Sequence, residues 1–166
     1  MGAGASVPLY PLWQALIRLL ADEAVDQGLA AAEATFRSGR MLAELPPILL
    51  AQADLARRRR DWIQAERRVG EALGIAAPRR MRLHHADALV LRGRIVLDRD
   101  GPHGAERALD AAETARSLAQ GCGYAWAERD ATALLADAYA ALGDEQRAHR
   151  QRKDAQTLTR RLQLPG

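Results

Sequence analysis

One arrangement of a turn followed by a helix recurs along this chain, and it restricts the possible folds more than any other feature. The copies are DWIQAERRVGEAL, HGAERALDAAETA and DEQRAHRQRKDAQ, which begin about 40 residues apart. Each copy has one alanine soon after its turn and a second one two helical turns later, namely Ala65 and Ala72, Ala105 and Ala112, and Ala148 and Ala155. Residues at this spacing share one stripe of a helix, and small side chains there allow two helices to approach closely. The repeat therefore predicts packed pairs of helices.

Turn-forming residues divide the sequence into eight predicted helices. We expect breaks at residues 26–28, 46–47, 61, 76–78, 98–104, 121–123 and 143–144. Pro46 and Pro47 are expected to end a helix that begins at Leu29. Consecutive helices then form hairpins over residues of about 8–45, 46–76, 80–120 and 124–163. Because a hairpin cannot bury its apolar face alone, we expect the hairpins to stack in one domain over 8–166, after a flexible segment of residues 1–7.

The composition also favours an all-α fold. Hydrophobic residues make up 48% of the chain and aromatic residues only 4%, so alanine and leucine supply most of the apolar surface. Both are strong helix formers, whereas β-branched residues are sparse and no long segment alternates apolar with polar residues. No apolar run approaches the ~18 residues of a transmembrane helix, the N-terminus lacks the pattern of a secretory signal, and the single Cys122 excludes an intrachain disulfide. We therefore expect a cytoplasmic protein without membrane association.

Residues capable of catalysis are present, but their spacing does not indicate a catalytic or metal site. His84 and His85 are adjacent, and adjacent side chains on a helix point about 100° apart, so these two do not form a zinc pair. Cys122 has no identifiable histidine partner, and the N-terminal glycines lack the strand, helix and lysine of a phosphate-binding loop. We therefore expect no enzyme activity, no cofactor and no metal. An enzyme on this fold needs a buried polar cluster, which spacing alone does not reveal.

The last predicted hairpin has the fullest set of small and aromatic residues. In LLADAYAALGDEQRA, Leu135, Ala136 and Tyr139 lie in the first helix, a Gly-Asp turn follows, and Ala148 opens the second helix. In this pattern the chain resembles the tetratricopeptide repeat (TPR) superfamily, although Arg152 replaces an aromatic residue and the repeats exceed the usual length of about 34 residues. Such long repeats are similar to the sensor arrays of bacterial signalling ATPases and transcription regulators. The resemblance implies a right-handed superhelix of about four stacked antiparallel hairpins, a TPR-like α-α solenoid.

The resemblance also implies a binding surface, because the first helices of TPR-like hairpins line a concave groove. Carrying the groove positions over to this sequence gives Leu50, Asp54, Arg57, Arg58, Asp87, Leu91, Arg94, Asp130, Leu134 and Asp137. Mixed charged and apolar residues suit an extended peptide, a protein partner or a neighbouring domain of a larger bacterial signalling protein. The alternative for the leucines is that they only pack helices together.

Two groups of arginines suggest a different function, the binding of an anion or of RNA. Arg57 to Arg60 end one predicted helix, and Arg79, Arg80 and Arg82 open another. In a stacked array the two groups can converge into one basic surface. The competing interpretation is a solvated helix end, where cations complement the negative end of the helix dipole. We do not expect a nucleic-acid partner, since few exposed aromatic residues are available to stack on bases.

Overall fold

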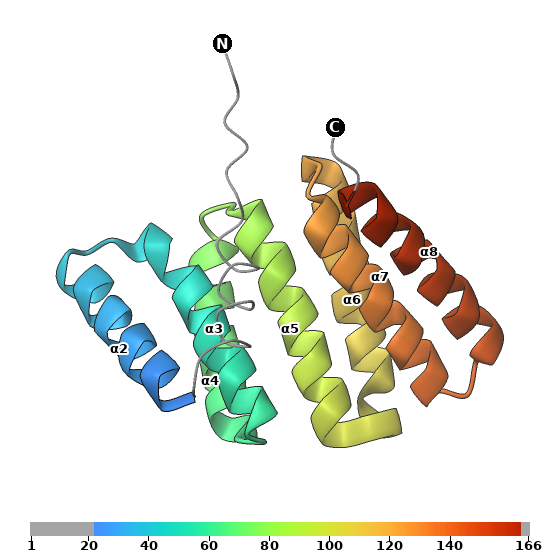
Figure 1. Ribbon diagram of the computed structural model, residues 1–166, viewed down its shortest axis with the longest axis horizontal. Coiled ribbons are helices and arrows are strands. Elements are labelled where there is room, and N and C mark those ends of the chain that lie inside the picture. Colours follow the sequence, from blue (N-terminus) through green and yellow to red (C-terminus); the bar gives the residue numbers. More distant parts are fainter. Residues whose placement is uncertain (1–21, 164–166) are drawn as a thin grey trace, which may run out of the picture.

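The computed structural model describes residues 22–163, so the segment predicted to be flexible and most of the first predicted helix lie outside the described residues. Within 22–163 every regular element is a helix, which confirms the predicted all-α class (Figure 1). The α-helices are α2 (Asp22–Ser38), α3 (Leu45–Arg58), α4 (Trp62–Ala76), α5 (Arg82–Asp100), α6 (Ala105–Cys122), α7 (Ala125–Ala141) and α8 (Glu145–Gln163). Two short 3₁₀ helices, η1 (Leu42–Glu44) and η2 (Gly101–Gly104), precede α3 and α6.

The helices pack in the order in which they follow one another along the chain. Each helix from α2 to α8 contacts the next, and the most extensive contacts lie between α3 and α4, α5 and α6, α6 and α7, and α7 and α8. The helix α5 also contacts both α3 and α7, and these three helices lie side by side in one layer, with α4 and α6 behind them (Figure 1). This layer presents one continuous face made from alternate helices.

The alanines of the repeat lie where the helices cross, as the sequence predicts. Ala65, Ala72, Ala105, Ala112 and Ala148 are fully buried, and Ala155 is nearly so. The first two pack in a cluster with leucines of α3 and α5, while Ala112 packs against Leu134 and Leu135 of α7. The small residues therefore hold the core together along its whole described length.

Gly93 on α5 also allows helices to approach each other closely. A Cβ atom at this position would lie 2.5 Å from Cδ2 of Leu134 on α7 and 3.4 Å from the carbonyl oxygen of Ala108 on α6. Three helices therefore meet at a point that has no room for a side chain. This position accepts glycine alone without a shift of its neighbours.

Similar turns join α3 to α4 and α7 to α8, the two helices of a hairpin in each case. Arg60 and Gly143 have positive φ angles of 60° and 77°, and each is followed by an aspartate that begins the next helix. The Asp61 carboxylate accepts the backbone N–H of Gln64, and the Asp144 carboxylate accepts that of Arg147, at 3.1 and 2.9 Å. Each aspartate thus satisfies one of the N–H groups that a helix start leaves without a partner.

The predicted boundaries of the second helix were wrong. The predicted break at residues 26–28 is absent, because α2 runs continuously through Gly28 and ends only at Ser38. Pro46 and Pro47 do not end that helix; they lie in the first turn of α3. Proline suits this place because the first N–H groups of a helix have no partner within the helix, so none is lost. The turn at Gly39 and Arg40 separates α2 from α3 instead.

We predict opposite effects of alanine at two helical glycines. Gly93→Ala should lower the free energy of unfolding by about 1–3 kcal/mol, because the new Cβ overlaps Leu134 in a packed core. Gly70 is exposed on α4 with no atom near its missing Cβ, so Gly70→Ala should raise that free energy by about 0.5–1 kcal/mol through helix propensity. Urea unfolding followed by circular dichroism measures both. Equal stability of the two variants would contradict the close approach at Gly93.

Candidate interaction face

The face formed by α3, α5 and α7 contains all ten residues predicted to line a groove, but they differ in exposure. Leu50, Leu91 and Leu134 are at most 1% exposed, so they pack helices together and do not contact a partner. The prediction that these three leucines line a groove was therefore wrong, because neighbouring helices cover the stripe on which they lie. Two of the predicted carboxylates, Asp54 and Asp87, are also buried. The remaining five residues are accessible, namely Arg57, Arg58, Arg94, Asp130 and Asp137.

At the α3 end of the face, a buried carboxylate holds two arginines. Asp54 is 1% exposed, and its two oxygens accept ion pairs from Arg57 at 2.9 Å and from Arg58 at 3.0 Å. Arg57 also pairs with Asp98, so it connects α3 to α5. Desolvation lowers the pKa of Arg57, but the carboxylates of Asp54 and Asp98 outweigh this effect and leave the pKa above its ordinary value. The guanidinium of Arg57 is therefore fixed and fully charged.

The centre of the face holds a buried acid. Asp87 on α5 is 6% exposed, and Oδ2 accepts a hydrogen bond of 3.1 Å from the phenol of Tyr124, which precedes α7. Burial raises the pKa of Asp87 to about 8, and the nearby Asp130 adds to this rise, while Tyr124 and Arg94 oppose it. At neutral pH the side chain is therefore mostly uncharged. Tyr124 was not predicted as a site residue, since its partner lies far away in the sequence and no local pattern links them.

Ion pairs also cross from α5 to α7. Arg94 lies 3.7 Å from Asp130, which pairs with Arg129 as well. The Arg129 guanidinium in turn lies 5.0 Å from the ring centre of the half-exposed Trp126. Asp137, about two helical turns further along α7 than Asp130, is exposed to solvent. The accessible part of the face is thus a row of alternating arginines and carboxylates above a buried apolar layer.

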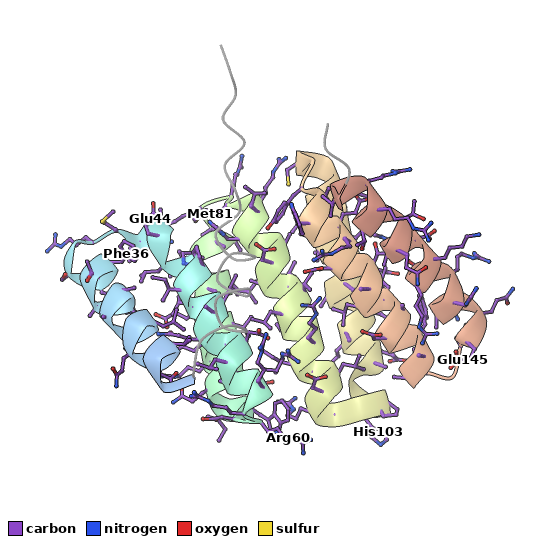
Figure 2. The ribbon with its side chains drawn as sticks, in the orientation of Figure 1. Phe36, Glu44, Arg60, Met81, His103 and Glu145 are labelled. Carbon is purple, nitrogen blue, oxygen red and sulfur yellow. The ribbon has the colours of Figure 1, made fainter. Side chains whose placement is uncertain are left out.

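The two arginine groups do not converge. Arg60 lies at the turn between α3 and α4, while Arg79, Arg80 and Arg82 lie around Met81, at the turn between α4 and α5; Figure 2 shows Arg60 and Met81 at opposite ends of the molecule. The prediction of a common basic surface was wrong, because α4 separates the turns by about 20 Å. Arg57, Arg58 and Arg59 are moreover paired with carboxylates.

Two hollows lie near this face. One, of about 460 Å³, lies outside it, between α4 and α6 above α5, and its apolar floor includes Val69, Leu89 and Val96. The other, of about 610 Å³, borders the face at the α3–α4 turn, where Arg57 and Arg58 line it together with Arg60, Trp62, Asp98 and Arg99. The buried pair of Asp87 and Tyr124 lines neither hollow.

Over residues 22–163, no group of three or more His, Cys, Asp or Glu side chains is placed to hold a metal ion. None of the helices in that part of the chain combines the length and apolar character needed to cross a membrane. Comparison with protein-family models, with curated proteins and with solved structures gave no significant match. Function is therefore argued from the residues of the face itself.

We predict that Asp87 makes stability depend on pH. Its pKa of about 8 in the folded protein exceeds the ordinary value of 3.8, so the folded protein keeps a proton that the unfolded chain releases between these pH values. Stability therefore falls as the pH rises through this window. Asp87→Asn mimics the protonated acid and does not titrate. The free energy of unfolding of the variant minus that of the wild type should therefore rise by up to about 1 kcal/mol per pH unit from pH 5 to pH 8. Urea titrations at several pH values measure this difference, and a constant difference would contradict the assignment.

Proposed function

We propose that this chain is a protein-interaction module, a short TPR-like right-handed superhelix whose α3, α5 and α7 face binds an extended peptide or a segment of a partner protein. The consecutive packing of the helices, the buried alanines of the repeat and the side-by-side arrangement of α3, α5 and α7 support it. From the resemblance we further propose that the module is the sensor or scaffold part of a larger bacterial signalling protein in the cytoplasm.

The observation that carries the proposal is the row of partly exposed ion pairs that crosses from helix to helix. Arg57 connects α3 to Asp98 on α5, and Arg94 connects α5 to Asp130 on α7. Such pairs hold three helices in register and leave charged atoms at the surface, spaced along a line that an extended chain follows. A catalytic role is not part of the proposal, since the buried Asp87 is held by Tyr124 and lines neither of the hollows described above.

The accessible side chains of the face also indicate how a partner is recognised. Because the three leucines are buried, the accessible groups are guanidinium and carboxylate groups. We therefore infer recognition through charge and hydrogen bonds, with affinity that falls as salt rises. An anion or RNA ligand on the two arginine groups is the less favoured alternative, since the groups lie apart and most of the first one is already paired.

We predict that reversing two charges on the face abolishes partner capture. The variant Arg58→Glu with Arg94→Glu places acidic groups beside Asp54 and Asp130, and should reduce the amount of specific partner retained on the immobilised chain by about tenfold or more. Quantitative mass spectrometry of proteins retained from the source cell measures this. Arg79→Glu with Arg82→Glu makes the same change in charge at the α4–α5 turn and serves as the control.

The comparison is valid only for folded variants, so the circular dichroism spectrum and melting temperature of each are measured first. Loss of a partner from the face variant but not from the control supports the proposal. Equal capture by both variants, with both folded, would refute the assignment of the face.

A further inference from the structure

The last helix concentrates positive charge. α8 contains six basic residues, Arg147, Arg150, Arg152, Lys153, Arg160 and Arg161, and two acidic ones, Glu145 and Asp154. Its excess of four positive charges exceeds the net charge of +3 of the entire chain. The rest of the molecule is therefore close to neutral, and the positive field of the protein originates mainly from this one helix.

The basic residues of α8 lie on its outer side. The helix packs on α7, and Ala148 and Ala155 are its buried residues. On the opposite side Arg150, Lys153, Thr157 and Arg160 follow one another at intervals of three or four residues, which places them on one stripe of the helix. All four are exposed, and Figure 2 shows long side chains with nitrogen tips that project outward from α8. We call these four residues the α8 stripe; it is about 15 Å long.

Most of this charge has no partner within the protein. Arg147 pairs with Asp144 and Arg152 with Glu145, at the start of the helix. Within residues 22–163, Arg150, Lys153 and Arg160 form no ion pair, unlike Arg57, Arg58 and Arg59 at the end of α3. A shallow hollow of about 420 Å³ runs beside the stripe and is lined by His149, Arg152, Lys153, Gln156, Thr157 and Arg160. The surface thus combines unpaired cations with hydroxyl and amide groups that donate hydrogen bonds.

We propose that the α8 stripe binds the phosphate backbone of a double-stranded nucleic acid. Arginine, lysine, threonine and glutamine are the side chains that contact phosphate oxygens, and a duplex presents one negative charge per about 1.7 Å of its axis, so several phosphates face a stripe of this length. The few exposed aromatic residues argue against stacking on single-stranded bases, but a duplex backbone requires no stacking.

Two other anionic partners fit the stripe less well. A membrane surface favours helices with large apolar side chains opposite the basic ones, whereas the buried residues of α8 are the small Ala148 and Ala155 and the stripe itself has no apolar residue. A protein interface relies on aromatic or aliphatic anchors at its centre, and the stripe has none of these either. The stripe lies on a helix outside the α3, α5 and α7 layer, so this inference is independent of the proposed peptide-binding face.

The test measures binding of the full chain to a fluorescent DNA duplex and to an RNA duplex, each of about 20 base pairs, by anisotropy between about 50 and 200 mM salt. With three or four phosphate contacts, the logarithm of the association constant should fall with the logarithm of salt with a slope of about −3. Affinity should therefore drop by about 40- to 150-fold over that range. A preference between the two duplexes identifies which nucleic acid is bound.

Two variants of equal charge separate the stripe from the overall charge. Arg150→Gln with Lys153→Gln and Arg160→Gln should weaken binding at least about tenfold and remove most of the salt dependence. Glutamine is a good helix former, so α8 should remain intact. Arg79→Gln with Arg80→Gln and Arg82→Gln removes the same charge at the α4–α5 turn and should change affinity less than about twofold.

Three results would overturn the proposal. The first is that the unmodified chain does not bind either duplex at low salt, and the second is that both variants lose the same amount of affinity. The third is that the chain binds polyglutamate more strongly than either duplex. The last would indicate an acidic protein partner instead. Failure of this test leaves the α3, α5 and α7 face unaffected, because no residue of that face is changed.

Discussion

The structure depends on the close approach of helices at residues with little or no side chain. Gly93 lets α5 contact both α6 and α7, and the fully buried Ala65 on α4 and Ala112 on α6 serve the same purpose. Dispersion contacts and the burial of leucines stabilise the fold only where backbones come this near. The layer of α3, α5 and α7, and hence the spacing of the charged residues on its surface, follows from these contacts.

The same packing decides which groups of the interaction face remain accessible. Leucines on the shared stripe are buried by adjacent helices, so the surface retains the ends of longer side chains such as Arg58 and Arg94. The buried carboxylic acids of this face are stabilised in two different ways. Asp54 forms ion pairs with two arginines, whereas Asp87 accepts a phenol hydrogen bond and has a pKa raised to about 8. The two buried acids of one face therefore have different kinds of partner.

From the sequence we could predict the helices after residue 45 and the alanines that pack them, because both depend on local patterns of turns and spacing. The course of α2 was missed, since tertiary contacts sustain a helix through Gly28 despite its weak local propensity. The resemblance to TPR-like hairpins placed Leu91 among the groove residues, but it could not say whether solvent or a neighbouring helix covers this side chain, which is buried. The contact of Asp87 with Tyr124 joins separate hairpins and leaves no local signal.

The position of α8 explains why its charges differ from those elsewhere. Arginines between two helices lose water when they are covered, so they are stable there only beside carboxylates, as Arg57 is beside Asp54 and Asp98. α8 packs mainly on α7 and also contacts α6, where Arg116 donates a hydrogen bond to Gln151. Lys153 and Arg160 are exposed on its outer side, so they stay hydrated and require no internal partner. Unpaired cations on a covered face would cost stability, whereas on this outer side they cost little and remain available to an external anion. The separation of paired from unpaired arginines therefore distinguishes the charges that support the fold from those that can bind a ligand.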